Sequence, residues 1–165
     1  HSINKTTITR TALASGSTVT VTYNPTTSGT HTGTVTIAST GAESKTVTLT
    51  GTATAAPTLT VDPTTLSFST EVGSSVTKTF TVAGSDLTGN VSLAVSGTGF
   101  AIDKTTISKN DATNGATVTV TYCPTAAGTH TGTVTLTSNG AASKTVSLSG
   151  TATSTPTLSA NPTSL

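Results

Sequence analysis

Charged side chains are scarce in this chain of 165 residues, because Asp, Glu, Lys and Arg together make up 8% of it and the formal net charge is +1. An ordinary soluble domain carries about a quarter charged residues. Binding to nucleic acid depends on Lys and Arg that contact phosphates, and the sequence has no run of these residues. The composition therefore argues against nucleic acid and anionic membrane surfaces as partners.

Cysteine occurs once, at Cys123, and the sequence has neither methionine nor tryptophan. A single cysteine excludes a disulfide framework and a cysteine-based metal site, so we expect Cys123 to be an incidental buried thiol. No apolar stretch approaches the roughly 18 residues that a membrane-spanning helix needs. We therefore expect no direct membrane insertion by this segment.

What the sequence does contain is a long internal repeat. INKTTI at residues 3–8 returns as IDKTTI at 102–107, and TVTVTYNPTTSGTHTGTVT at 18–36 returns as TVTVTYCPTAAGTHTGTVT at 117–135. The offset is about 99 residues throughout, and about 40 of roughly 66 aligned pairs are identical. A period of this size is typical of one self-contained β-sandwich domain rather than a solenoid unit.

The repeat predicts three parts in the chain. Residues 1–56 correspond to the C-terminal part of one repeat, 57–155 to a complete repeat, and 156–165 to the first strand of a further repeat. The first part lacks counterparts of residues 57–99. A ten-residue strand donated by another chain would leave about 33 of these positions unfilled, so we expect the natural protein to be longer.

Abundant Ser and Thr with little charge is also typical of a disordered, mucin-like stalk, but the periodicity excludes that alternative. In TVTVTY at 117–122, apolar residues alternate with Thr, as they do in a strand with one buried face. The predicted class is all-β, with tandem immunoglobulin-like antiparallel β-sandwiches of seven to eight strands per repeat. The predicted strands of the complete repeat are 58–62, 65–71, 75–84, 90–97, 100–108, 116–123, 129–138 and 143–152.

The same alternation predicts which side chains form the core of the complete repeat. About 20 large apolar side chains, each worth roughly 1.5 to 3 kcal/mol when buried, would hold the domain without a disulfide or a metal. They are Leu59, Val61, Leu66, Phe68, Val76, Phe80, Val82, Val91, Leu93, Val95, Phe100, Ile102, Ile107, Val118, Val120, Tyr122, Val134, Leu136, Val146 and Leu148.

Several long segments carry a family resemblance. These are KTFTVAGSDLTGNVSLAVSG at 78–97, ATVTVTYCPTAAGTHTGTVTL at 116–136, SKTVSLSGTAT at 143–153 and PTLSANPTSL at 156–165. Together they resemble the tandem immunoglobulin-like repeats of secreted and surface proteins of Bacteroidota, and the expected sandwich is similar to abnormal-spindle and hydin type domains. The resemblance implies spacer or accessory modules outside the cell, with no catalytic residues.

The repeat also tests candidate catalytic residues, because a residue that serves chemistry in every repeat should recur at the same offset. No carboxylate in the overlap does so. Paired acid and base catalysis therefore has no support across the repeats. The carboxylates that change are Asp62 (paired with Asn161), Asp103 (Asn4), Asp111 (Ala12) and Glu43 (Ala142), whereas Glu71 and Asp86 lie outside the overlap.

His31 and His130 do recur, but neither has a further His, Cys or acid at ligand spacing, so we expect a structural role at a strand edge. Tyr23 and Tyr122 recur in phase with inward valines. We expect them to anchor the core, with the hydroxyl bonded to backbone, although a ligand-stacking platform is the alternative. The recurring glycines suit turns and close backbone approach; the pairs are Gly16 and Gly115, Gly29 and Gly128, Gly33 and Gly132, Gly41 and Gly140, Gly51 and Gly150.

Threonine rows form the remaining recurrent pattern, and we expect them on solvated strand faces because Thr has high β-propensity. Glycosylation and ice binding are alternatives for such rows, and Asn4 and Asn90 begin N-glycosylation sequons. The rows comprise Thr131, Thr133, Thr135 and Thr137, then Thr117, Thr119 and Thr121, and in the first part Thr32, Thr34 and Thr36.

The sequence therefore predicts a non-catalytic structural repeat (spacer, stalk or filament shaft) of a long extracellular or cell-surface protein, without catalytic residue, cofactor or metal. Its expected partners are neighbouring repeats of the same chain and, in a filament, other copies. The alternatives are a ligand- or glycan-binding adhesin module and an accessory domain of a surface enzyme. The linkers TATAAPTLTVDP at 52–63 and TATSTPTLSANP at 151–162 are short and proline-containing, which predicts a stiff, regular array.

Overall fold

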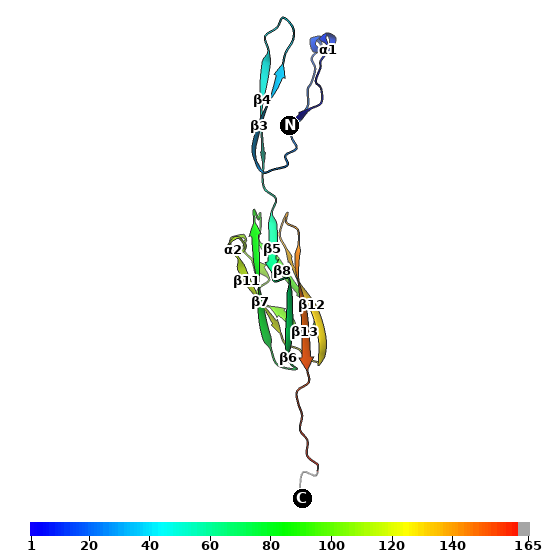
Figure 1. The fold of residues 1–165 in the computed structure, drawn as a ribbon, viewed down its shortest axis with the longest axis vertical. Helices are drawn as coiled ribbons and strands as arrows, with labels where there is room; N and C mark the ends of the chain where they lie inside the picture. The colour runs from blue at the N-terminus through cyan, green and yellow to red at the C-terminus, as the bar shows by residue number, and fades with distance from the viewer. Residues whose placement is uncertain (162–165) are drawn as a thin grey trace. The chain divides into compact units, whose positions relative to one another are not determined.

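The computed structural model describes residues 1–161, and the chain divides into two compact units, His1–Ala55 and Ala56–Leu165 (Figure 1). We call them unit 1 and unit 2 and describe each by itself. Part of the strand predicted at 156–165, residues 162–165, lies outside the described residues. Residues 157–161 form no strand, whereas their counterparts at 58–62 pair with residues 81–85.

Unit 2 consists of two β-sheets packed face to face. The four-stranded sheet has the order β5 (Thr58–Asp62), β7 (Val76–Ser85), β11 (Ala116–Tyr122) and β9 (Phe100–Ile102). The five-stranded sheet has the order β10 (Thr106–Ile107), β8 (Val91–Ser96), β12 (Gly128–Thr137), β13 (Lys144–Thr153) and β6 (Thr65–Glu71). This distribution of strands is that of an immunoglobulin-like sandwich, so the predicted all-β class is confirmed.

The prediction of purely antiparallel sheets is wrong at one strand pair. β6 runs parallel to β13, with Leu66 opposite Leu148, whereas β5 pairs antiparallel with β7 in the other sheet. Pro63 has no backbone N–H and ends the ladder of β5, and the chain then crosses to the second sheet within two residues. Because the chain keeps its direction while it crosses, β6 meets β13 in the parallel orientation.

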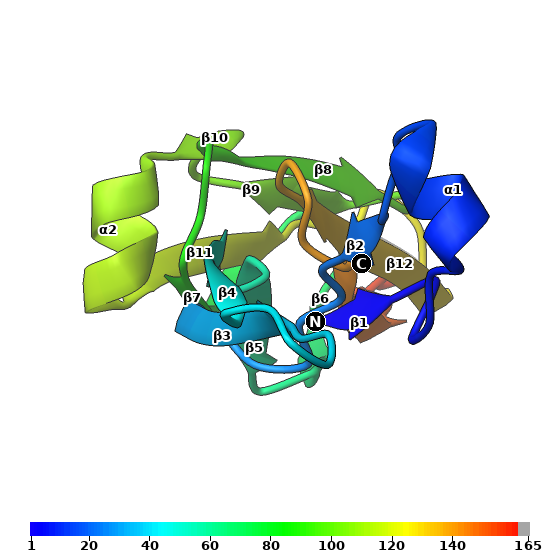
Figure 2. The same cartoon turned by 90° about the horizontal axis from the view of Figure 1, so that it is seen from above.

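One local prediction also needs correction. The strand expected at 100–108 is divided into β9 and β10, which belong to different sheets, so the described residues of unit 2 form nine strands rather than seven or eight. Between the predicted strands 100–108 and 116–123, Lys109–Asn114 form the short helix α2, which packs beside β7 and β11 at one end of the sandwich (Figure 2). It is shorter than two turns, and Ala112 is its one buried residue.

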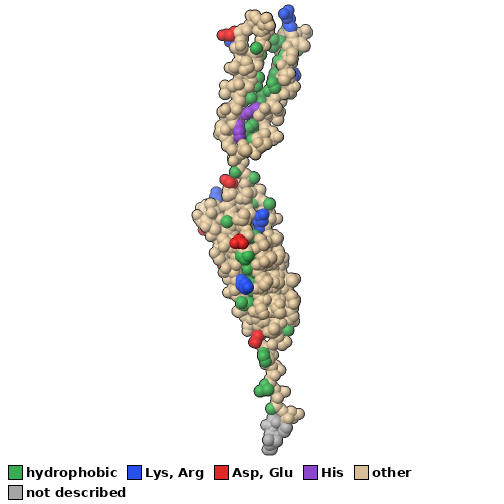
Figure 3. Space-filling model, viewed as in Figure 1, with side chains coloured by type: hydrophobic (Ala, Val, Ile, Leu, Met, Phe, Trp, Pro, Cys, Tyr) green, Lys and Arg blue, Asp and Glu red, His purple; other side chains and the backbone are tan. Residues whose placement is uncertain are grey.

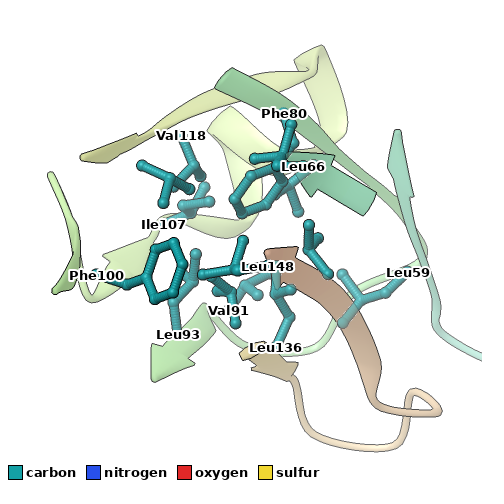
Figure 4. Packing of buried hydrophobic residues seen from close by; sticks show 14 of the residues in the cluster. Leu59, Leu66, Phe80, Val91, Leu93, Phe100, Ile107, Val118, Leu136 and Leu148 are labelled. Atoms are coloured by element: carbon teal, nitrogen blue, oxygen red, sulfur yellow. The ribbon is translucent and has the colours of Figure 1, made fainter. Parts of the chain in front are cut away.

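The core lies between the two sheets and contains the predicted residues (Figure 4). Only Val61, Val76, Val95 and Ile102 of the predicted set are partly exposed, and all the others are buried. The alternation of each strand explains this outcome, since β13 buries every second residue from Val146 onward. Ala112, Pro124 and Ala152 are also buried and were not predicted, because small residues and proline carry little apolar signal.

Unit 1 repeats part of this arrangement at the same offset. It contains β1 (Ser2–Ile3), α1 (Arg10–Ala14), β2 (Val21–Thr22), β3 (Gly29–Ile37) and β4 (Lys45–Ala53), which correspond to β9, α2, β11, β12 and β13. β1 pairs with β2 and β3 pairs with β4, both antiparallel. No residue of unit 1 is buried.

Candidate functional site

The first candidate site is the pair of recurring residues Tyr122 and His130. Tyr122 is the last residue of β11, and the strand alternation places its ring in the core, where it is fully buried. Its hydroxyl lies 2.6 Å from Nδ1 of the half-buried His130 on β12, so the expected bond to backbone is wrong. Burial raises the pKa of the Tyr122 phenol, which therefore stays protonated at neutral pH.

Two neighbours fix the position of the Tyr122 ring. Phe100 stacks on it, with ring centroids 4.8 Å apart and an angle of 28° between the planes. On the other side Gly150 of β13 leaves room for the ring, because a Cβ there would overlap the Tyr122 ring atoms. Gly150 therefore recurs for close packing rather than for a turn. We call Phe100, Tyr122, His130 and Gly150 the tyrosine cluster.

Unit 1 contains the same cluster with one replacement. The Tyr23 hydroxyl lies 2.7 Å from His31 Nδ1, and a Cβ at Gly51 would lie 2.7 Å from the Tyr23 ring. His1 takes the place of Phe100, with its ring centroid 4.8 Å from that of Tyr23. His31 Nε2 also lies 3.1 Å from Oγ1 of Thr27. The two copies thus share a tyrosine–histidine hydrogen bond that links two segments of the sandwich.

The tyrosine cluster lacks the groups that a catalytic or metal site needs. A histidine that acts as a base in a triad is oriented by a carboxylate, whereas the recorded partner of His130 is a phenol. Within residues 1–161, no three His, Cys, Asp or Glu side chains converge to hold a metal ion. The geometry of the cluster is that of a packing contact, and the prediction of no catalytic residue remains a prediction.

Asp103 and Asn4 form a second recurring contact, which the sequence comparison did not reveal because the residue type changes. The backbone N–H of Thr119 donates to Asp103 Oδ1 at 2.9 Å, and that of Thr20 donates to Asn4 Oδ1 at 2.9 Å. The shared need is an acceptor oxygen, which both side chains supply. The sequence reveals the equivalence of Asp103 and Asn4 only when Asp and Asn are both treated as hydrogen-bond acceptors.

Several influences act on the Asp103 carboxyl. Partial burial by its neighbours works to raise its pKa, but the hydrogen bond from the Thr119 N–H and the ammonium of Lys104 outweigh this effect. The pKa of Asp103 is therefore lowered from its ordinary value. Lys104 Nζ lies 3.2 Å from Asp103 Oδ2 and also donates to the Thr117 carbonyl at 2.5 Å. This pair is exposed, and it tethers the loop after β9 to β11.

An open hollow of about 430 Å³ lies beside this pair, between α2 and the start of β11. Its two charged side chains are already engaged, since Lys104 bonds to the Thr117 carbonyl and Asp111 accepts a hydrogen bond from Ser108 Oγ at 2.6 Å. No aromatic ring lines the hollow. Its lining residues are Lys104, Thr106, Ile107, Asp111, Asn114, Gly115, Ala116 and Thr117.

The threonine rows lie on the solvent side of the strands, as predicted. Ser149 Oγ donates to Ser67 Oγ at 3.0 Å on the five-stranded sheet. Charged side chains are few on the visible face (Figure 3). Cross-strand pairing places hydroxyl beside hydroxyl on both sheets. The rows are Ser96, Thr133, Ser147 and Thr65, then Thr131, Ser149 and Ser67 on the larger sheet, with Thr77 and Thr121, Thr79 and Thr119, Thr81 and Thr117 on the smaller.

Cys123 is exposed, so the prediction of a buried thiol is wrong. It follows Tyr122 directly, and the strand alternation that turns Tyr122 inward turns the next residue outward.

The two sequon asparagines are already hydrogen-bonded: Asn4 accepts from Thr20, and Asn90 Oδ1 accepts from the backbone N–H of Lys109 at 3.2 Å. In the part of the chain that the structure describes, no helix is long and apolar enough to cross a membrane.

Comparison with known proteins gives structural likeness but no family. No family profile matches the chain, and no curated protein matches it. A solved structure of a Bacteroides ovatus GH5 xyloglucanase with a XXXG heptasaccharide aligns at 17% identity and a TM-score of 0.47, over 61% of this chain and 20% of that chain. The chain thus spans a small part of that enzyme.

Two further solved structures are similar. The ASH/PapD-like domain 7 of human CEP192 aligns at 12% identity and a TM-score of 0.44, over 59% of this chain and 87% of that chain. Domains 4 and 5 of the S-layer protein SbsC align at 20% identity and a TM-score of 0.38, over 73% of this chain and 65% of that chain. Because these scores are all below 0.5, the immunoglobulin-like assignment above stands on the strand pairing of unit 2 itself.

Proposed function

We propose that this chain is a non-catalytic structural segment, a spacer, stalk or filament shaft, of a long extracellular or cell-surface protein. The observation that carries the proposal is which residues recur at the offset of about 99. Tyr122, His130 and Gly150 recur as Tyr23, His31 and Gly51, and they hold the sandwich together. The carboxylates in the overlap do not recur.

The surface of unit 2 supports the same proposal. Both sheets present rows of Ser and Thr hydroxyls to solvent, which keep a strand face soluble without a strong charge. The net charge of the whole chain is +1, so copies of the chain would repel one another little and could lie close together in an array. Such surfaces suit a repeat whose partners are neighbouring repeats and, in a filament, other copies of the chain.

The linkers support a spacer that keeps its length. TATAAPTLTVDP at 52–63 has a close counterpart at 151–162, and neither is a flexible Gly/Ser-rich linker. Proline restricts the backbone on both sides of the junction. An array of such repeats joined by one linker sequence would lengthen by a constant amount per repeat. From the size of a domain of this length, we expect this amount to be roughly 35 to 45 Å.

Solution scattering from arrays of two, four and six copies of residues 57–155, joined by the natural linker, tests this proposal. The expected result is a maximum dimension that grows linearly with the number of repeats. The matched control replaces residues 54–57 by a Gly/Ser linker of equal length, and we expect its growth to fall towards a square-root dependence. If the natural array also follows a square root, the spacer proposal is wrong.

The location is tested separately. An antibody against unit 2 should label intact cells of the source organism as strongly as permeabilised cells. Labelling only after permeabilisation would contradict an extracellular or cell-surface address and would leave the scattering result unaffected.

A further inference from the structure

Lys78 is a charged residue at an inward position of β7. The strand buries Phe80 and Val82, which lie two and four residues further along it. The register against β11 places Lys78 opposite Val120, which is completely buried. Residues directly opposite each other in an antiparallel pair lie on the same face of the sheet, so Lys78 lies on the core face. The side chain is nevertheless exposed.

The exposure of Lys78 follows from an open side of the sandwich. β5 pairs only with residues 81–85 of β7, so residues 76–80 have β11 on one side and, within the described residues, no strand on the other. β6 in the opposite sheet likewise has β13 on one side and no described strand on the other. β6 and β7 contact each other. We call their two unpaired edges, residues 65–71 and 76–80, the open flank.

The side chain of Lys78 reaches from β7 towards β6 across the open flank. Its Nζ lies 6.0 Å from the centroid of the buried Phe68 ring of β6, which is the outer limit of a cation–π contact. A lysine stem covers apolar surface while its ammonium stays in water. Among the residues that the structure describes, no carboxylate forms an ion pair with Lys78. The ammonium therefore depends on water, and the open flank supplies it.

The other strand edges of unit 2 are protected by different features. β9 and β10 have three and two residues, which is too short for an extended ladder with another chain. β5 is preceded by Pro57 and followed by Pro63, and neither proline has a backbone N–H to donate. The open flank is longer, with seven residues in β6 alone. Lys78 is the only charged residue within 65–70 and 76–80.

We propose that the open flank is a self-pairing edge for a second copy of this chain, and that Lys78 prevents this pairing. A strand added to β6 or to residues 76–80 of β7 covers the flank and removes the ammonium from water. Burial of an ion without a partner is strongly unfavourable, so the added strand is rejected. The inference depends on unit 2 alone and holds whether or not the array is a spacer.

A second copy is the occupant that the composition favours. The same edge on two copies matches in length and in side-chain pattern, so it can pair with itself about a two-fold axis. The net charge of +1 provides little repulsion between chains. Apart from Lys78, the stretches 65–70 and 76–80 consist of Thr, Ser, Val, Leu and Phe, most of which are favoured in strands. Such edges pair readily unless a specific feature prevents it.

The test replaces Lys78 by valine in the full chain and measures association by sedimentation velocity over a range of protein concentrations. We expect Lys78→Val to associate with itself roughly tenfold or more tightly than the native chain does. Hydrogen exchange at residues 65–71 and 76–80 should slow as the concentration of the variant rises. Unit 1 is identical in all the proteins compared, so a difference between them reports on unit 2.

Two control variants separate the position of the charge from its loss. Lys109→Val removes the same charge from the exposed start of α2, and Lys78→Arg keeps a charge at the flank. Both should associate as weakly as the native chain. Lys78→Thr copies the residue type on either side of it and should associate as Lys78→Val does, which keeps the test valid if the valine variant does not fold.

The proposal is overturned if folded Lys78→Val and Lys78→Thr associate no more tightly than the native chain. Equal association of Lys109→Val would also overturn it, because net charge rather than the flank would then be responsible. So would equal association of Lys78→Arg, or slowed exchange confined to residues outside 65–71 and 76–80. Slowed exchange at these two stretches in the valine variant, with both controls unchanged, supports it.

Discussion

At the scale of single residues, the most demanding contact is the one between Gly150 and the Tyr122 ring. Any Cβ at this position would overlap the ring, and Phe100 stacks on the face of the same ring, which restricts its movement. The recurrence of Tyr23 against Gly51 shows that both copies depend on this contact.

We predict that Gly150→Ala lowers the free energy of unfolding of unit 2 by about 2 kcal/mol or more, because the added methyl group overpacks the core. Gly89→Ala is the matched control, since a Cβ at Gly89 meets no atom within 4 Å. We expect the control to change the free energy by less than about 0.5 kcal/mol. Urea denaturation of both variants measures the difference, and equal values would show that the close approach is not important.

A second residue-scale prediction concerns Asp103→Asn, which copies Asn4 of unit 1. The pKa of Asp103 is lowered in the folded state, so the charged carboxylate contributes stability above its unfolded pKa of about 4, and this contribution is lost as the pH falls through the folded pKa. Asn keeps the acceptor for the Thr119 N–H but does not titrate. The contribution should be below about 1 kcal/mol, because the pair is exposed.

The measurement is urea unfolding of both proteins at about pH 6 and about pH 2.5. The native chain should lose slightly more stability between the two pH values than Asp103→Asn does. If both proteins lose the same amount, the carboxylate has no special interaction in the folded state, and the lowered pKa is contradicted.

At the scale of secondary-structure elements, the sequence does not predict α2, because KNDATN has the composition of a turn. Its start is set by Ser108, whose Oγ accepts from the Asp111 N–H at 3.1 Å, and its end by Gly115 at φ 86°. Thr9 occupies the same capping position before α1 and accepts from the Ala12 N–H at 3.3 Å. The cap recurs although the helix sequence does not.

Ser108→Ala removes this cap, and we predict a loss of about 1 kcal/mol in the stability of unit 2. Ser108→Thr should retain most of the stability, because Thr9 serves as the cap in unit 1. Ser143→Ala, in the exposed turn before β13, is the control and should have little effect. Thermal unfolding ranks the three variants by stability. A Ser108→Ala variant as stable as the control would contradict the role of the cap.

At the scale of the whole molecule, the two units differ in whether they have a core. Unit 2 buries a continuous cluster between its sheets, and unit 1 buries no residue. Residues 57–155 should therefore fold alone in one cooperative transition with a β-rich circular dichroism spectrum. Residues 1–55 alone should unfold without a sharp transition. A predominantly helical spectrum for residues 57–155, or gradual melting, would contradict this prediction.

The sequence by itself determined most strand positions and the inward set, since the alternation of Val, Leu and Phe with Thr decides which face of a strand is buried. The twenty predicted core positions required no tertiary information. The repeat likewise identified Tyr122, His130 and Gly150 as residues with a shared role. The repeat did not show that the Tyr122 phenol contacts the His130 imidazole, because this contact spans two strands.

Tertiary structure alone decided the features that depend on which segments meet. Nothing local in TLSFSTE at 65–71 indicates that it lies parallel to β13, because the direction of pairing follows from the crossing at Pro63. The exposure of Val47 is decided in the same way: its sequence context matches that of the buried Val146, and only the presence or absence of covering strands separates them. An alternating pattern specifies which face of a strand is apolar, whereas the neighbouring segments determine whether that face is buried.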